Sequence, residues 1–177
     1  GSTAVDLTRR EADIAIRATS KPPDASLGKK VGAFNFALYA LPEYAVQHKD
    51  TPLHEQRWCL INGSGEWLVP MLWKKKEQVE QATVFSSANA LAVLNAAAAG
   101  VGLTFMPCYL GDADARLVRI SELIQPLTLE LWLLTHPDLR HTARVKALMA
   151  YLHEKLKEQA DLFAGQRPQG KSVVKFS

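Results

Sequence analysis

The chain has 177 residues, 47% of them hydrophobic and 22% charged, which is typical of a globular domain with an apolar core and excludes a disordered or fibrous chain. The formal net charge is +3 at pH 7, and the basic runs lie far apart, at residues 9–10, 29–30 and 74–76, which favours solvated surface charge over a nucleic-acid-binding face. The longest nearly apolar run, residues 90–106, is interrupted by polar residues and glycines, so neither a transmembrane segment nor a secretion leader is expected.

Along the chain, apolar runs and turn-forming residues alternate in a regular way. Short apolar runs bounded by turn residues predict strands at residues 12–16, 31–40, 57–61, 66–73, 82–85, 102–106, 117–120 and 127–135. Leu41-Pro42-Glu43 predicts the start of a short helix, since proline is tolerated in a first helical turn, and residues 74–80 predict a polar turn. Longer helices are expected at 88–99 and 142–164. The pattern predicts an α/β domain with a mostly parallel sheet.

The final helix has the clearest periodicity. One apolar stripe follows helical spacing, with Val145, Leu148, Met149, Leu152 and Leu156 at i, i+3, i+4, i+7 and i+11. Burial of this stripe against the protein's own sheet and partial exposure in an interface between copies are both consistent with the pattern. Gly165 predicts the end of the helix, and residues 166–177 are expected to form a flexible tail.

Residues 85–107, "FSSANALAVLNAAAAGVGLTFMP", predict a strand, a hydroxyl-bearing turn, a slim helix and a second strand, which together form a βαβ unit. The glycines at 100 and 102 are expected to end the helix and to allow a tight entry into the next strand. Ser86 and Ser87 would lie at the edge of the sheet where ligands bind in such units, close to a helix N-terminus that favours anions. The alternative is that one serine merely caps the helix and the alanines merely pack.

Catalytic and metal-binding patterns do not emerge from the residues. The two cysteines, Cys59 and Cys108, lie in apolar segments and are expected to be buried free thiols, as suits a reducing cytoplasm. The five histidines lack ligand spacing, and the sequence has no nucleophile elbow, phosphate loop or paired acids. We therefore expect neither an enzyme, nor a cofactor, nor a metal site.

Three segments carry a resemblance to a known family, and it covers nearly the whole chain. "LTRREADIAIR" (7–17), "AAAAGVGLTFMPCYLGD" (96–112) and "LELWLLTHPDLRHTARVKALMAYL" (129–152) resemble, in wording, order and spacing, the effector-binding domain of LysR-type transcriptional regulators. The resemblance implies an α/β fold like that of type 2 periplasmic binding proteins. Such a fold has two Rossmann-like subdomains, joined by two crossover segments, with a small ligand held between them.

Carried over by position, the resemblance places residues 1–45 and 125–165 in the first subdomain and residues 46–124 in the second. It implies a ligand-sensing domain of a cytoplasmic bacterial transcription regulator, which binds a small anionic or polar effector and assembles as a dimer or tetramer. The effector-binding residues that it implies are Ser2, Thr3, Ser86, Ser87, Asn89, Phe105, Pro107 and Tyr109. For Ser2 and Thr3 the assignment holds provided that Gly1-Ser2 belongs to the natural sequence.

Two parts of the family's pattern have no counterpart in the sequence. These are the amino-terminal winged helix-turn-helix and the first strand–helix unit of the effector-binding domain, so contact with DNA is expected only through a separate domain, and contact with a membrane is not expected. Two alternatives remain at this stage. One is the solute-binding protein of a transporter, which shares the fold; the other is a small α/β enzyme acting on a carboxylate, although it would need a positioned proton carrier.

Overall fold

The computed structural model describes residues 13–19, 28–62, 81–124 and 127–168. The chain divides into two compact units, one formed by residues 1–35 and 127–166 and the other by residues 36–126 and 167–177. The expected strand at 66–73, the expected turn at 74–80, and Ser2 and Thr3 lie outside the described residues. None of the described helices combines the length and the hydropathy that a membrane span requires.

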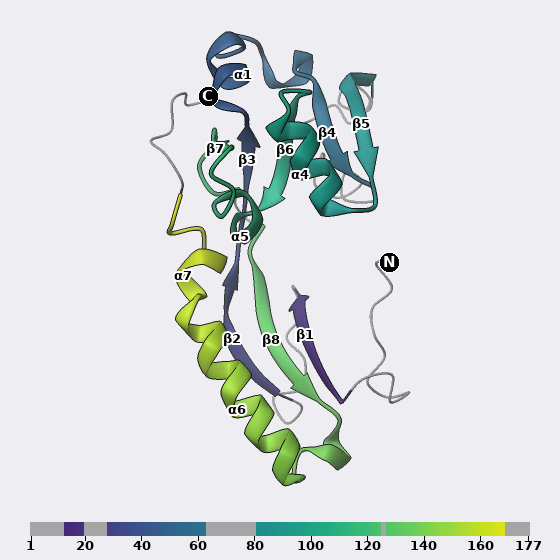
Figure 1. Cartoon of the computed structure of the whole chain (residues 1–177), viewed down its shortest axis with the longest axis vertical. Coiled ribbons are helices and arrows are strands. Elements are labelled where there is room, and N and C mark those ends of the chain that lie inside the picture. Colours follow the sequence, from purple (N-terminus) through teal and green to yellow (C-terminus); the bar gives the residue numbers. More distant parts are fainter. Residues whose placement is uncertain (1–12, 20–27, 63–80, 125–126, 169–177) are drawn as a thin grey trace. The chain divides into compact units, whose positions relative to one another are not determined.

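The first unit is a three-stranded antiparallel sheet covered on one face by helices (Figure 1). Its strands are β1 (Ile14–Thr19), β2 (Gly28–Phe34) and β8 (Leu129–Thr135), in the order β1-β8-β2. Helices α6 (Ala143–Glu158) and α7 (Ala160–Phe163) follow β8 after a 3-10 turn at Pro137–Leu139. Val145 and Met149 of α6 pack against Val31, Leu131 and Leu133, so one part of the expected apolar stripe forms the core of this unit.

The other members of the α6 stripe differ in exposure. Leu152 and Leu156 are partly buried and pack against the same core, whereas Leu148 is 48% exposed. Tyr151, which lies outside the stripe, is 58% exposed. The expected continuous helix over 142–164 is wrong at one point: α6 ends at Glu158, and Gln159 adopts φ −106° and ψ 12° before α7 begins. Gly165 ends α7 at φ 71°, a left-handed conformation that glycine adopts without strain, as expected.

The second unit contains a mixed five-stranded sheet (Figure 1). Its strands are β3 (Phe36–Ala40), β4 (Trp58–Ile61), β5 (Thr83–Ser87), β6 (Leu103–Pro107) and β7 (Val118–Arg119), in the order β5-β4-β6-β3-β7. The helical elements are α1 (Pro42–Gln47), the 3-10 turn Leu53–Glu55, α4 (Ala90–Ala98) and α5 (Cys108–Gly111). Strand β4 pairs in parallel with β5 and β6, whereas β3 is antiparallel to both β6 and β7.

The expected mostly parallel sheet is therefore wrong for the described strands, because four of their six pairings are antiparallel. The physical reason is that β2, β3 and β8 lie next to the two points, residues 35/36 and 126/127, where the chain changes from one unit to the other. These strands are not linked by βαβ crossovers, which would require parallel pairing. Among the described elements, the expected strand–helix–strand order is confirmed for β5, α4 and β6.

The expected single strand over residues 31–40 is also wrong, since it is divided between two sheets. Strand β2 pairs with β8 and strand β3 pairs with β6 and β7, and Asn35 separates them. The backbone N–H of Asn35 donates to the Phe163 carbonyl at 3.0 Å, and its side-chain amide donates to the Ala164 carbonyl at 3.0 Å. The boundary between the two compact units lies between residues 35 and 36, whereas the expected subdomain boundary lies at residue 45.

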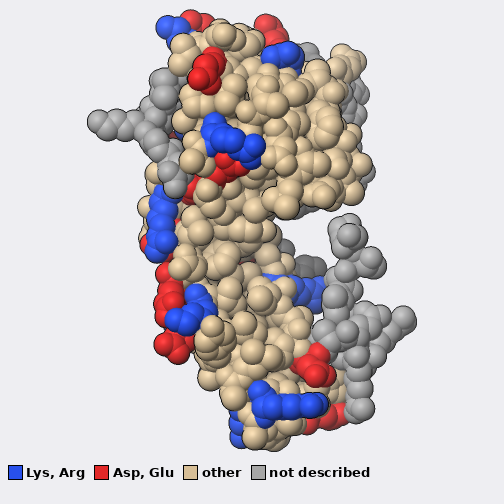
Figure 2. Space-filling model, in the orientation of Figure 1, with Lys and Arg blue, Asp and Glu red and all other residues tan. Residues whose placement is uncertain are grey.

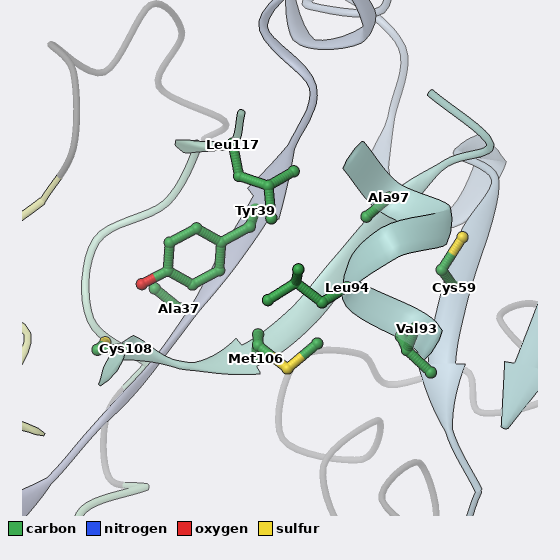
Figure 3. Packing of buried hydrophobic residues seen from close by; sticks show 9 residues of the cluster. All are labelled: Ala37, Tyr39, Cys59, Val93, Leu94, Ala97, Met106, Cys108 and Leu117. Carbon is green, nitrogen blue, oxygen red and sulfur yellow. The ribbon is translucent and has the colours of Figure 1, made fainter. Parts of the chain in front are cut away.

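The core of the second unit lies between its sheet and α4. Figure 3 shows Val93, Leu94 and Ala97 of this helix beside Cys59 and Met106 of the strands, and all five residues are buried. The small side chains at 96–99 keep the helix slim, and Gly100 ends it at φ 76°. At Gly102 a Cβ atom would lie 2.3 Å from the carbonyl oxygen of Arg57, so the tight strand entry expected there is confirmed.

Candidate functional site

The carboxyl ends of three parallel strands meet at one edge of the second unit's sheet. Strand β4 ends at Ile61, β5 at Ser87 and β6 at Pro107. The register pairs Ile61 with Ser87, and the N–H of Asn62 donates to the Ser87 carbonyl at 3.0 Å. In open α/β sheets, ligands bind outside this edge, where helix N-termini also point. The edge is therefore the candidate functional site.

Ser86, Ser87 and Asn89 all belong to this edge, at the passage from β5 into α4. Ser86 and Asn89 are exposed and Ser87 is partly buried. The Ser87 hydroxyl oxygen accepts a hydrogen bond from the N–H of Asn89 at 3.1 Å. The structure thus brings together the expected residues of this segment and leaves the Ser86 and Asn89 side chains accessible.

The cap of α4 differs from the one that the sequence suggested. Helix α4 begins at Ala90 rather than residue 88, and its N-cap is Asn89, whose Oδ1 accepts from the N–H of Leu91 at 2.9 Å. A serine is therefore not the helix cap, because the strand continues through Ser87 and the chain needs two further residues to turn. The first turn of α4 holds no acidic side chain, so no fixed anion offsets the positive end of the helix dipole there.

Pro107, Phe105 and Tyr109 lie on or beside the end of β6, in different environments. Pro107 is partly buried, pairs with Phe36 across the sheet and is the N-cap of α5. Tyr109 in α5 is partly buried, and desolvation raises the pKa of its phenol. Phe105 is only 4% exposed, and its ring stacks on Phe36 with a centroid distance of 5.0 Å and an interplanar angle of 10°. Phe105 therefore supports the edge from within the core.

A buried polar cluster anchors α5 beside this edge. The Tyr39 hydroxyl donates to Asp112 Oδ1 at 2.7 Å, and the Arg119 guanidinium forms an ion pair with the same carboxylate. The Asp112 side chain is fully buried, and the Arg119 side chain is 12% exposed. Burial raises the pKa of Tyr39, and the neighbouring Cys108 thiol and Asp112 carboxylate raise it further. A buried charge pair with its remaining lone pairs satisfied holds α5 in one position.

Burial and a raised pKa make both thiols in this unit poor nucleophiles. Burial raises the pKa of Cys59 to about 11, opposed only in part by Arg57. Burial also raises the pKa of Cys108, although Tyr39 and Arg119 act in the opposite direction. Both side chains are fully buried and free, so the expectation of buried free thiols is confirmed. Within the described part of the chain, His, Cys, Asp and Glu side chains form no group able to hold a metal ion.

Of the three basic runs in the sequence, only residues 29–30 lie in the described part of the chain, where both are exposed; residues 9–10 and 74–76 lie outside it. Figure 2 shows basic and acidic side chains interspersed over the face in view, with no single large basic patch on its described part. A pocket of about 410 Å³ lies beside α4 and α5, lined by Leu91, Leu94, Asn95, Leu110, Ala113, Asp114, Ala115 and Arg116. None of these residues belongs to the set expected to bind an effector.

Sequence analysis missed three parts of the site. Asn62 directly follows the predicted strand at 57–61, and Phe36 lies inside the predicted strand at 31–40, so neither position carries a local signal of a site. The cluster around Asp112 also went unnoticed, because Tyr39 is 73 residues away along the chain. The one local signal was the acid–base pair Asp112 and Arg119, seven residues apart on either side of a short loop.

Comparison with known proteins gives a consistent result. The model of the LysR substrate binding domain family matches residues 1–157. The regulatory domain of CrgA, a LysR-type transcriptional regulator from Neisseria meningitidis, has a TM-score of 0.66 at 18% identity, with 88% of this chain and 81% of that one covered. The effector domain of the transcriptional regulator AmpR of Pseudomonas aeruginosa has a TM-score of 0.64 at 21% identity, with coverages of 88% and 78%.

A third similar structure is the regulatory domain of AphB from Vibrio vulnificus, treated with cumene hydroperoxide. It has a TM-score of 0.61 at 23% identity, with 84% of this chain and 77% of that one covered. Identities at this level show a shared fold. A search of curated proteins gave no significant match.

Proposed function

The chain belongs to the family of LysR substrate-binding domains, the ligand-sensing part of LysR-type transcriptional regulators, and we propose that it detects a small anionic or polar effector at the carboxyl edge of β4, β5 and β6. Its fold is the α/β type 2 periplasmic-binding-protein fold of that family. The family match favours a regulator over the transporter solute-binding protein that the sequence left open. The observation that carries the proposal is that Ser86, Ser87 and Asn89 lie together at the N-terminus of α4, whose first turn has no acidic side chain.

In this proposal the accessible polar groups contact the effector directly. Ser86 and Asn89 offer side chains, Ser87 lies between them, and the first turn of α4 favours negative charge. Pro107 and Tyr109 bound the site on the β6 side, and the Phe105 ring stacks on Phe36, the residue that pairs with Pro107. The family resemblance implies Ser2 and Thr3 as further effector-binding residues.

The proposed mechanism is a shift between two arrangements of the two subdomains. An effector that binds one arrangement more tightly raises its population, by no more than its difference in affinity for the two. The change is transmitted through a homo-oligomer in the cytoplasm to a DNA-binding domain outside this chain. In this role the chain binds and signals and carries out no reaction.

The decisive experiment replaces Ser87 with glutamate. The helix dipole accepts a carboxylate near its N-terminus, so Ser87→Glu should fold, while its fixed charge occupies the position of the effector's charge. A thermal-shift panel of small carboxylates should then find ligands that stabilise the wild type, by about 2.7 kcal/mol at 100 times their dissociation constant. The same ligands should leave the Ser87→Glu variant unshifted.

The matched control is Gln47→Glu, which introduces the same charge at the exposed end of α1. Helix α1 follows β3, which runs antiparallel to β6, so Gln47 lies away from the candidate edge. The control should keep the full ligand shift. Equal ligand shifts in the wild type and in Ser87→Glu would remove the effector from this edge.

A further inference from the structure

A separate pocket lies entirely within the first unit, and none of the residues expected to bind the effector takes part in it. Its volume is about 260 Å³, and it lies between the start of β2, the end of β8 and the beginning of α6. The lining residues are Gly28, Lys29, Thr135, Arg140, Val145, Lys146 and Met149.

Three basic side chains surround this pocket, each from a different segment. Lys29 belongs to β2, Arg140 follows the 3-10 turn at Pro137–Leu139, and Lys146 lies in the first turns of α6. All three side chains are exposed at the mouth. Among the described residues, no carboxylate makes an ion pair with any of the three; the recorded contact is from Arg140 Nε to His141 Nε2 at 2.9 Å.

The floor of the pocket is apolar. Val145 is 3% exposed and Met149 is 8% exposed, and both also pack into the core of the first unit. Thr135 contributes a buried hydroxyl, which donates to the Asp13 carbonyl at 2.8 Å and so keeps its own oxygen as an acceptor site. No acidic side chain lines the pocket among the described residues. The nearby Asp138 lies 3.5 Å from the His136 ring.

The close approach of β2 to β8 at Gly28 shapes this pocket. Gly28 faces Leu134 in the register of β2 and β8, and a Cβ atom at residue 28 would lie 2.2 Å from the Leu133 carbonyl oxygen. The absence of a side chain at Gly28 therefore allows the close approach that brings Lys29 near the start of α6. An apolar cavity of about 150 Å³ is enough for a benzene ring, so this pocket has room for a ring or short chain with one charged group.

We propose that this pocket is a second ligand site, selective for a small organic carboxylate that carries an aromatic ring or a short apolar chain. The carboxylate pairs with Lys146, Arg140 and Lys29 at the mouth, and the apolar part lies on Val145 and Met149. The site goes beyond the effector site proposed at the edge of the other unit. Because α6 forms one wall, its occupation stiffens the packing of α6 on β2 and β8.

The test uses isothermal titration of the 177-residue chain with sodium benzoate. The informative variant is the double replacement Arg140→Gln and Lys146→Gln, which keeps a polar side chain at each position and removes two charges. We expect its dissociation constant for benzoate to rise about tenfold or more, since a hydrogen bond to a charged group contributes about 1.5–3 kcal/mol. Lys157→Gln, on an exposed position of the same helix outside the pocket, should bind as the wild type does.

Three further measurements make the result specific. Benzyl alcohol, which lacks the charge, and sodium phosphate, which lacks the ring, should both bind the wild type much more weakly than benzoate. Ser87→Glu should leave benzoate binding at the pocket unchanged, which separates this site from the proposed effector site. The circular dichroism of each variant confirms that it is folded.

Four results would overturn the proposal. These are no benzoate binding by the wild type at millimolar concentration, equal affinity in the wild type and the double variant, equal affinity for phosphate and benzoate, and loss of binding in Ser87→Glu with retention in the double variant. The last of these would place benzoate in the effector site instead.

Discussion

The Tyr39 hydroxyl donates a hydrogen bond of 2.7 Å to the Asp112 carboxylate, and both side chains are excluded from solvent. The carboxylate is also paired with Arg119, so a strand, a short helix and the following strand converge on one buried charge. This cluster lies beside the candidate effector site, because α5 begins directly after Pro107. Its members are therefore expected to affect stability first and ligand binding through the position of α5.

Removal of Asp112 should cost more than removal of the Tyr39 hydroxyl. Asp112→Ala removes the buried carboxylate that forms an ion pair with Arg119 and should lower the free energy of unfolding by about 3–5 kcal/mol. Tyr39→Phe removes one hydrogen bond to a charged group and should cost about 1.5–3 kcal/mol. Urea unfolding followed by circular dichroism measures both. Asp50→Ala, at an exposed position, is the control, and an Asp112→Ala variant as stable as this control would contradict the assigned role.

Gly111 and Tyr39 should show strong coupling. A Cβ atom at residue 111 would lie 2.3–2.5 Å from three atoms of the Tyr39 ring, so Gly111→Ala should destabilise the protein by about 1–3 kcal/mol through overpacking. In a Tyr39→Leu background the ring is gone and the alanine should cost much less. A double-mutant cycle gives this difference directly. Additive effects of the two substitutions would show that the alanine is accommodated elsewhere.

The cap of α4 distinguishes two neighbouring side chains. Asn89→Ala removes the side-chain acceptor of the Leu91 N–H and should lower the free energy of unfolding by about 1 kcal/mol. Ser87→Ala removes only the contact with the Asn89 N–H outside the helix and should cost less. Thermal or chemical unfolding of the two variants side by side gives the order. A larger loss in Ser87→Ala would transfer the capping role to the serine.

Alkaline pH should lower the free energy of unfolding, because two buried thiols and a buried phenol must ionise. The folded pKa of Cys59 is about 11, above the ordinary value of 9.0, so its contribution to stability is complete below pH 9 and is lost as the pH rises through 11. The pKa values of Cys108 and Tyr39 are raised too, so they act in the same direction. One such group changes the free energy of unfolding by at most about 1.4 kcal/mol per pH unit.

The measurement is urea unfolding at a series of pH values from 8 to 11, under reducing conditions, for the wild type and Cys59→Ala. The variant lacks one ionisable thiol, so its stability should decline less steeply above pH 9. A thiol reagent such as Ellman's should react slowly with the native protein at pH 8 and rapidly once urea unfolds it. Rapid labelling of both thiols in the native state would show that they are accessible.

Self-association should involve the outward face of α6. Leu148 and Tyr151 are about half exposed on a helix whose Val145 and Met149 are already buried, and the proposed function includes a homo-oligomer. Sedimentation velocity at tens of micromolar should detect a dimer or larger species, and Leu148→Lys should shift it towards monomer. Ala150→Lys, at another exposed position of α6, tests for a general effect of charge. A wild-type chain that sediments only as monomer would reject this interface.

The sequence by itself determined the type of several elements and the resemblance to the family. The apolar runs around residues 57–61, 102–106 and 127–135 became β4, β6 and β8, and the stripe of α6 has the spacing that the periodicity predicted. Helix stops at Gly100 and Gly165 also follow from local chemistry, because glycine adopts a positive φ without strain. Such features depend on neighbours within one or two turns, so a single segment of sequence encodes them.

Only the tertiary structure decided which distant segments meet. Asn35 divides one apolar run between two sheets because the end of α7 supplies two carbonyl groups to it. Tyr39 contacts Asp112, and Lys29 lines one pocket with Arg140 and Lys146, although no local pattern in the sequence specifies either arrangement. The reason is physical: periodicity fixes which face of an element is apolar, whereas the partner of that face depends on the packing of the whole unit.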